Sequence, residues 1–207
     1  MIDKSLRLTG SKTLLDHGRN FLGAWAVGFR VTHQENRVIS GVPETYINTN
    51  AKTVAGLRYM LQHFSFDYLL RTNTSTYVNL RLLTEFVKGL PQEGYYGGPV
   101  GMADGIEYAS GTGMLFSRDI VRLIACDPKW EFGVIDDVAV GRCMKRNGIS
   151  LHPLGRVDIL NEADIQTLNR DELRSTFLVR CKGNQGRDHD INVMHLVHAA
   201  YRDMGLA

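Results

Sequence analysis

The stretch FDYLLRTNTSTYVNL, residues 66–80, decides the expected fold, because a short apolar strand ends there in polar residues. The run from Tyr68 to Leu70 is typical of a buried strand. Hydrophilic residues follow it directly: Arg71, Thr72, Asn73, Thr74, Ser75 and Thr76. In α/β proteins the carboxyl end of a central strand collects ligand-binding and catalytic groups. The stretch therefore predicts either a site built from amide and hydroxyl groups or one that has lost its carboxylates.

Helices and strands alternate on both sides of this stretch. Apolar residues recur at helical spacing from Val54 to Phe64, in a helix that Thr49 or Asn50 would cap. Asn79 is the expected cap of the next helix. The alternation continues with strands at 95–100 and 113–116 and with helices at 118–125 and from 136 onward. We therefore expect one layered α/β domain over residues 1–207, with a mostly parallel sheet.

The composition is that of an ordinary globular protein, with 43% hydrophobic and 22% charged residues and a formal charge of +2. This charge gives no reason to expect nucleic acid or a membrane surface as a partner. No stretch approaches the ~18 consecutive apolar residues of a membrane span, and the N-terminal MIDKSLRLTG has no signal-peptide core. We expect a cytoplasmic protein with three reduced thiols, on Cys126, Cys143 and Cys181.

The acidic pair Asp136 and Asp137, in FGVIDDVAVGRCMKRNGI, is the sharpest chemical signal. The pair follows an apolar run and opens a helix. One interpretation is structural, with an N-cap and a carboxylate that the helix dipole favours. In the other, one carboxylate caps the helix while its neighbour faces a cleft as a general base. The pattern alone leaves both interpretations open.

Two glycine-containing segments carry candidate binding residues. In YASGTGMLFSRD, Gly111 and Gly113 would let a ligand approach the backbone, although a plain bend fits as well. The Tyr108 ring could stack on a sugar or a base, or it could be an aromatic residue of the core. In VRCKGNQGRDHD, two glycines are accompanied by the cations Arg180, Lys182 and Arg187. Such cations suit the binding of a diphosphate, although a solvated turn fits as well. The nearby histidines lack the spacing of a zinc site: His189, His195 and His198.

Taken in order, these segments resemble the fringe and β1,3-glycosyltransferase family (family 31) of GT-A fold. RNFLGAWA is similar to its R-x-x-I-R-x-T-W segment, and YASGTGMLFSRD to its Y-C-S-G-G-G-Y-V-L-S-R-D. ETYINTNAKT and LLRTNTSTYVN resemble D-x-Y-x-N-L-T-x-K-T and K-T-D-D-D-x-F-V-N, and DDVAVGRCMKRNGI resembles E-D-V-Y-V-G-x-C-L-K-x-L-G-I. The resemblance covers residues 19–149.

The resemblance implies a single GT-A-like (Rossmann-like) domain with a central, mostly parallel mixed sheet. It implies an inverting glycosyltransferase, a β1,3-type hexosyltransferase that moves a sugar from a UDP-sugar to a glycan or lipid-linked acceptor. Asp137 corresponds to the general base, and Asp136 would orient that base or the acceptor hydroxyl. The sugar and acceptor pocket falls on Tyr108, Ser110 and Gly111.

The chain departs from this family where the family binds a divalent cation. The three aspartates of the family correspond to Asn73, Thr74 and Ser75, whose neutral oxygens attract Mg²⁺ or Mn²⁺ weakly. We therefore expect basic side chains to neutralise the donor diphosphate in place of a metal cofactor. The donor-binding residues would be Lys52, Arg71, Thr72, Asn73, Thr74, Ser75, Arg180, Lys182 and Arg187. The alternatives are an inactive nucleotide- or glycan-binding relative and an unrelated α/β nucleotide-binding or hydrolase domain.

Overall fold

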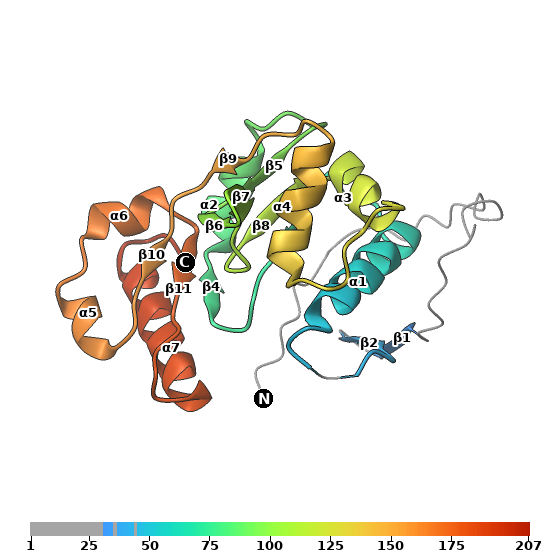
Figure 1. Cartoon of the computed structure of the whole chain (residues 1–207). Helices are drawn as coiled ribbons and strands as arrows, with labels where there is room; N and C mark the ends of the chain where they lie inside the picture. The colour runs from blue at the N-terminus through green and yellow to red at the C-terminus, as the bar shows by residue number, and fades with distance from the viewer. Residues whose placement is uncertain (1–30, 35–36, 44) are drawn as a thin grey trace.

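The computed structural model describes residues 31–34, 37–43 and 45–207 (Figure 1). In this part of the chain it has a mixed α/β fold of seven helices and four small sheets. The similarity of RNFLGAWA to the glycosyltransferase motif falls outside the described residues. The described chain starts with a hairpin of β1 (Val31–Gln34) and β2 (Arg37–Ser40).

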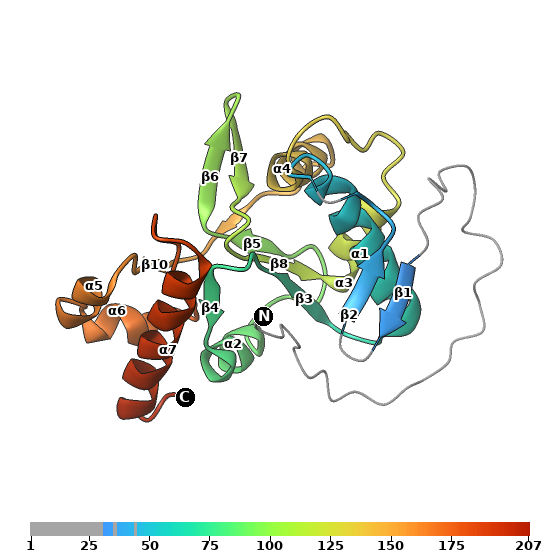
Figure 2. The same cartoon turned by 90° about the horizontal axis from the view of Figure 1, so that it is seen from below.

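The largest sheet is mixed, so the expectation of one central, mostly parallel sheet was wrong. Its strand order is β3 (Tyr68–Arg71), β8 (Met114–Ser117), β5 (Tyr96–Gly98) and β9 (His152–Pro153). β8 is antiparallel to both β3 and β5, and only β5 and β9 are parallel. The cause is the hairpin of β6 (Val100–Ala103) and β7 (Ile106–Ala109), which reverses the chain before β8 pairs between β3 and β5. Figure 2 shows this hairpin projecting from the sheet.

Three helices pack with this sheet around the larger of the two hydrophobic cores found among the described residues (Figure 1). They are α1 (Thr49–His63), α3 (Arg118–Ala125) and α4 (Asp136–Arg146). The sheet contributes buried Tyr96, Met114 and Phe116 to this core, and α4 contributes Val140 and Met144. α4 thus has a fully buried face, so its first residues, Asp136 and Asp137, are fixed against the sheet.

A second core lies under α7 (Arg187–Asp203), a helix that Figure 2 shows at the end of the molecule away from α1. It joins this helix to a sheet of β10 (Val157–Asp158), β11 (Leu178–Arg180) and β4 (Thr76–Val78). Its buried side chains are Ile159, Leu173, Val179, Cys181, Val193, Val197 and Tyr201. Short helices border it: α5 (Glu162–Gln166) and α6 (Arg170–Ser175).

The helix after β4, α2 (Leu80–Val87), begins as the sequence predicts. The Asn79 side chain accepts a hydrogen bond from the backbone N–H of Leu82 at 3.0 Å, which confirms Asn79 as the N-cap. Asn79 also donates to the carbonyl of Leu206 at 3.0 Å. The cap therefore ties the middle of the chain to the segment after α7.

The loop between β7 and β8 connects the two cores. Thr76 Oγ1 lies 2.9 Å from the carbonyl oxygen of Thr112. A Cβ atom at Gly113 would come within 2.7 Å of the Leu178 side chain, so glycine permits this close approach. The glycine segment therefore packs between the larger core and the second core, and its backbone is fixed from both sides.

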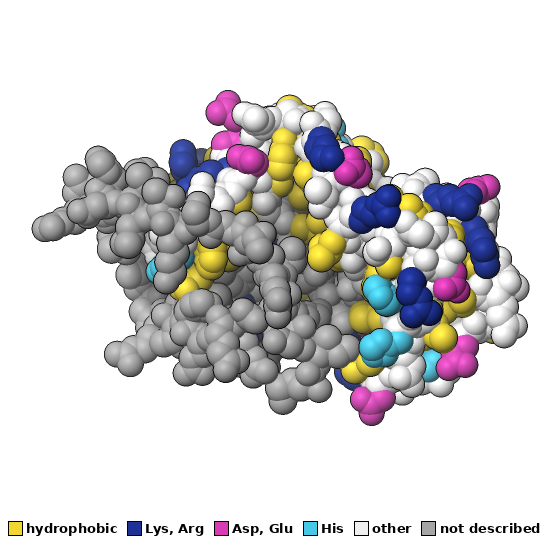
Figure 3. Space-filling view, turned by 180° about the vertical axis from the view of Figure 1, so that it is seen from behind, with side chains coloured by type: hydrophobic (Ala, Val, Ile, Leu, Met, Phe, Trp, Pro, Cys, Tyr) yellow, Lys and Arg dark blue, Asp and Glu magenta, His cyan; other side chains and the backbone are white. Residues whose placement is uncertain are grey.

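The surface of the described chain carries mixed charge. Figure 3 shows basic, acidic and histidine side chains interspersed on the face opposite to that of Figure 1. None of the helices in the described residues combines the length and apolarity that crossing a membrane requires.

Candidate functional site

The acidic corner at the start of α4 is positioned from α1 by a buried asparagine. Asn50 lies inside α1, whose N-cap is Asn48, so the prediction that residue 49 or 50 caps this helix was wrong. The Asn50 amide donates to the carbonyl oxygens of Glu131 and Val134, both at 2.7 Å. Its oxygen accepts from the indole N–H of Trp130 at 2.6 Å. These three hydrogen bonds fix the loop that leads into α4.

Asp136 is paired within the protein. Thr53, one turn after Asn50 on α1, donates to Asp136 Oδ2 at 2.8 Å. Arg71, the last residue of β3, donates through Nη2 to the same oxygen and forms an ion pair with it. Asp136 is buried, and the N-cap of α4 is Ile135 rather than either aspartate. Because two donors occupy Oδ2 of Asp136, its neighbour Asp137 is the better placed of the two to accept a proton.

Asp137 is half-buried and accepts only backbone hydrogen bonds among the described residues. Its Oδ2 accepts from the N–H of Gly111 at 3.2 Å, and its Oδ1 from the N–H of Val138 at 2.9 Å. Burial raises the pKa of this carboxyl above its ordinary value of 3.8, and the Asp136 carboxylate raises it further. The two N–H groups and the Arg71 guanidinium oppose this rise in pKa. Asp137 is thus a carboxyl group in a desolvated position, and its raised pKa strengthens it as a base.

Gly111 connects the acidic corner to the end of β3. While its N–H binds Asp137, its carbonyl oxygen accepts from Arg71 Nη1 at 3.0 Å. A Cβ atom at this position would lie 2.8 Å from Arg71 Nη1, so a larger residue would displace the ion-paired guanidinium. The structure thus brings together Asp136, Asp137, Arg71 and Gly111, four of the residues that the sequence nominated.

Tyr108 and Ser110 border the same site. The Tyr108 ring packs over Gly101 in the neighbouring strand, and a Cβ atom at Gly141 of α4 would come 2.5 Å from Tyr108 Cβ. Burial and the nearby Asp137 charge raise the pKa of the Tyr108 phenol. Ser110 Oγ lies 3.3 Å from Thr112 Oγ1, on the other side of Gly111.

The polar end of β3 is largely engaged in internal hydrogen bonds. Asn73 Oδ1 accepts from the N–H of Ser75 and lies 2.9 Å from Thr76 Oγ1, which closes a local turn. Ser75 is buried; its hydroxyl donates to Asp190 Oδ2 at 3.0 Å and accepts from Arg187 Nη1 at 2.5 Å. Of the remaining residues at this strand end, Thr72 is half-buried and Thr74 is exposed.

These polar groups do not fit a divalent cation. Asn73 and Ser75 supply neutral oxygens that already bind protein donors, whereas Mg²⁺ and Mn²⁺ prefer carboxylates. In the described part of the chain, no group of three or more His, Cys, Asp or Glu residues could hold a metal ion.

The predicted basic residues do not converge on one point. Arg180 pairs with Asp158 at 3.3 Å, and Lys182 is exposed beyond β11. Lys52 lies half-buried in the first turn of α1. The structure adds Arg156, which also pairs with Asp158, at 2.6 Å. Arg156 was not predicted as a site residue: it directly precedes β10, and nothing in the nearby sequence indicates that β11 lies beside it.

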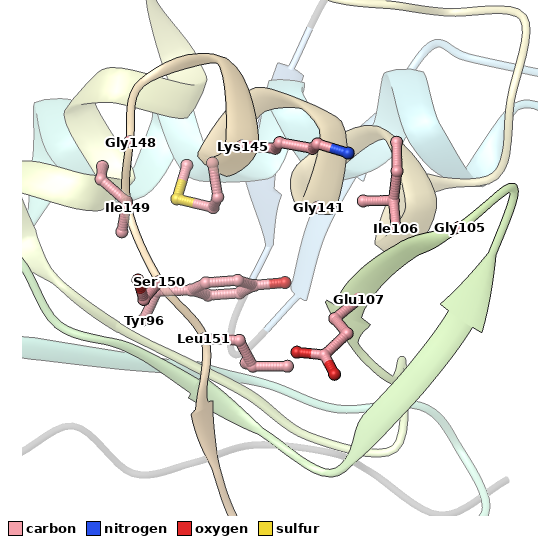
Figure 4. A pocket seen from close by; sticks show the side chains of 11 residues that line it. Tyr96, Gly105, Ile106, Glu107, Gly141, Lys145, Gly148, Ile149, Ser150 and Leu151 are labelled. Carbon is pink, nitrogen blue, oxygen red and sulfur yellow. The ribbon is translucent and has the colours of Figure 1, made fainter.

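A cavity of about 380 Å³ lies beside α4 and β7 (Figure 4). Its lining includes Tyr96, Glu107, Gly141, Lys145 and Ser150. The Tyr96 ring extends across this cavity in Figure 4, and its hydroxyl accepts from the N–H of Ala109 at 2.6 Å. Gly141 is about one helical turn from Asp137. The cavity therefore adjoins the acidic corner without containing either carboxylate.

The fold and site define a mixed α/β protein with a half-buried carboxylate beside an ion pair of a buried aspartate and a half-buried arginine. No family model matches the chain. No curated protein matches it either. The likeness to the family 31 glycosyltransferases therefore remains a prediction from the sequence motifs.

Proposed function

We propose that this protein is an inverting glycosyltransferase that moves a sugar from a UDP-sugar to an acceptor hydroxyl, with Asp137 as the general base. One observation carries the proposal: Asp137 is half-buried, its carboxyl pKa is raised, and no side chain in the described structure neutralises it by direct hydrogen bonding. A general base works best when its pKa approaches the working pH, and a raised pKa moves a carboxylate in that direction.

The proposed reaction needs one proton acceptor and one stabilised leaving group. An Asp137 carboxylate oxygen takes the proton of the acceptor hydroxyl as that oxygen bonds to the anomeric carbon. The bond from this carbon to the diphosphate oxygen breaks, and UDP leaves with the electron pair. The attack comes from the face opposite to the diphosphate, so the anomeric configuration inverts. Tyr108 and Ser110, on either side of the Gly111 segment, are the proposed contacts to sugar and acceptor.

Asp136 and Arg71 have a positioning role in this proposal. Their ion pair holds the start of α4 against the end of β3, and Arg71 also fixes the carbonyl of Gly111. The Gly111 N–H in turn holds Asp137. A base that is held in this way needs little reorganisation when the acceptor arrives. The negative charge that develops on the diphosphate requires separate cations, because the donor set at Asn73 and Ser75 does not suit a metal.

The assay is UDP release from a panel of UDP-sugars, with simple glycosides as acceptors, in EDTA and again with Mn²⁺. We expect turnover with at least one donor, and a loss of at least about 100-fold in Asp137→Asn. Asp188→Asn is the matched control, because Asp188 is an exposed aspartate in the first turn of α7. Equal turnover in Asp137→Asn and wild type would exclude this base, and no UDP release from any donor would reject the transferase proposal.

A second candidate function is nucleotide or glycan binding without catalysis. The observation that favours it is the internal bonding of Asn73 and Ser75, since residues at the family's metal-binding positions now stabilise a turn and α7. In that case calorimetry would detect binding of UDP or a glycan while the release assay stays at background. Asp137→Asn would then leave the affinity nearly unchanged.

A further inference from the structure

We propose that Arg156 and Arg180, which share the carboxylate of Asp158, form the binding site for the diphosphate of the donor. The choice of a nucleoside diphosphate as ligand rests on the proposed function. The site itself rests on the geometry of these three side chains, two of which the sequence analysis did not nominate.

The cluster has two guanidinium groups and one carboxylate. Arg156 binds Asp158 with two parallel hydrogen bonds, from Nε at 2.6 Å and from Nη2 at 3.2 Å. Arg180 is the register partner of Asp158 in the parallel pair of β10 and β11, and its Nη1 lies 3.3 Å from Asp158 Oδ2. One positive charge is therefore left over. This surplus charge is accessible to an anion, because the side chains of Arg156, Arg180 and Asp158 are 28%, 30% and 36% exposed, respectively.

The arrangement suits a diphosphate better than a single small anion. A guanidinium presents N–H groups in a planar fork that binds phosphate oxygens bidentately. In the described structure, Arg180 uses only Nη1 in a hydrogen bond, so its remaining N–H groups can bind a ligand. Two arginines that a common carboxylate holds side by side can each take one phosphate group of a diphosphate.

Arg156 also links this cluster to the acidic corner. Its Nη1 lies 3.4 Å from Thr112 Oγ1, and Thr112 follows Gly111, whose N–H lies 3.2 Å from Asp137 Oδ2. The guanidinium and the proposed base are therefore at most about 14 Å apart, given standard backbone dimensions. A diphosphate at the arginines would leave its sugar beside the Ser110–Gly113 segment.

The other nominated arginines are less suitable. Arg71 is paired with the buried Asp136 and also binds the Gly111 carbonyl. Arg187 lies beside the buried Asp190 and donates to Ser75. Each of these two arginines has one carboxylate to itself, so neither pair carries the surplus charge that Arg156 and Arg180 share.

The test is titration calorimetry in EDTA with pyrophosphate, UDP and uridine as separate probes. We expect wild type to bind pyrophosphate and UDP but not uridine. Arg156→Met and Arg180→Met should each weaken both affinities at least about tenfold, the usual cost of a charged hydrogen bond. Arg174→Met is the control, because Arg174 is exposed and pairs with Asp171 on α6. Unchanged pyrophosphate affinity in both arginine variants would overturn the proposal, as would binding of uridine equal to that of UDP.

Asp158→Asn separates a ligand site from a structural ion pair. Its carboxylate competes with the diphosphate for the two guanidinium groups, so its removal should tighten pyrophosphate binding several-fold. A purely structural cluster would lose stability and gain no affinity, which would count against the proposal. Circular dichroism melting of each variant shows whether the chain remains folded.

The outcome is distinguishable from that of the proposed function. Arginine-dependent pyrophosphate binding in a protein that turns over no donor would support this site and reject glycosyl transfer. Asp137-dependent turnover that survives both arginine substitutions unchanged would support glycosyl transfer and reject this diphosphate site.

Discussion

Two buried aspartates in this protein, Asp136 and Asp190, have nearly the same chemical partners, but only one stands at a candidate catalytic site. Each accepts hydrogen bonds from a hydroxyl and an arginine: Thr53 and Arg71 at Asp136, Ser75 and Arg187 at Asp190. Asp190 also accepts from the N–H of Gly183 at 2.9 Å. A buried carboxylate with an arginine is therefore a structural device that this chain uses at both of its cores.

The surroundings of the two pairs differ. Asp137 adjoins the first pair, and the neighbouring Asp136 charge helps to raise its pKa. The arginine of that pair is 19% exposed, whereas Arg187 in the second pair is 61% exposed. The comparison indicates that the internally bonded carboxylates stabilise the fold, while the half-buried carboxylate beside one of them is suited to chemistry.

The largest expected effect comes from removal of each buried carboxylate. Asp136→Ala leaves a mostly buried Arg71 without its partner, so we expect it to lower the free energy of unfolding by about 3–5 kcal/mol. Asp190→Ala lets the exposed Arg187 turn to water, and its cost of about 2 kcal/mol is that of the lost buried hydrogen bonds. Urea denaturation of both variants checks the order. An equal or reversed order would mean that exposure of the arginine does not distinguish the two pairs.

The next largest effect on stability is expected at Gly111, which adjoins the pair of Asp136 and Arg71 but not the pair of Asp190 and Arg187. Gly111→Ala places a methyl group against Arg71 Nη1, so it should cost about 1–3 kcal/mol by overpacking. Gly56→Ala is the control with the opposite sign. Gly56 lies in α1 with nothing near its Cβ position, so alanine there should stabilise the protein by about 0.5–1 kcal/mol. Thermal unfolding measures both, and a harmless Gly111→Ala would show that Arg71 is free to move.

Local signals in the sequence predicted part of this fold. The Asn79 cap and the helix that begins at Asp136 follow from residue types at single positions, and both are confirmed. The sheet direction depends on the β6–β7 hairpin, which the sequence analysis missed. Its turn residues Asp104 and Gly105 both have positive φ, and Asp-Gly is a known signal for such a turn. This signal is present in the sequence, and a parallel sheet is expected only when it is overlooked.

The candidate site was harder to derive because its contacts join distant segments. Asp136 and Asp137 were evident as a pair, but their different roles depend on Arg71 and Thr53, which lie far away in the chain. Ser75, in contrast, was predicted as a ligand-binding residue from its position at a strand end, but it is bonded within the protein. Its hydroxyl bonds to α7, more than 100 residues later, and only the folded structure shows this.

A smaller effect concerns the protonation of Asp137 itself. A carboxyl ¹³C NMR titration should place its midpoint above the ordinary 3.8, because burial and the Asp136 charge disfavour ionisation. Arg71→Met removes a cation that lowers this pKa, so the midpoint should move further up. A midpoint below 3.8 would mean that the backbone hydrogen bonds of Gly111 and Val138 dominate.

The smallest effect is on stability, and its sign separates Asp137 from the two paired aspartates. Because the folded pKa is raised, the folded protein holds this proton more tightly than the unfolded chain does. The free energy of unfolding therefore falls as pH rises from 3.8 through the folded pKa, and the ionised group stays destabilising above it. Asp137→Asn removes that charge, so at pH 7 it should stabilise the protein, by less than about 1 kcal/mol because solvent screens the group.

Urea denaturation of Asp137→Asn at pH 7 and near pH 3 measures this difference, and the gain should disappear at the acidic pH, where the wild-type carboxyl is protonated. Asp188→Asn, at an exposed aspartate in the first turn of α7, is the matched control. A gain in stability together with a loss of turnover would indicate that the charge of Asp137 is maintained for catalysis at the expense of the fold. A loss of stability at pH 7 would instead make Asp137 a third structural carboxylate, and the acidic corner would then resemble the pair at Asp190.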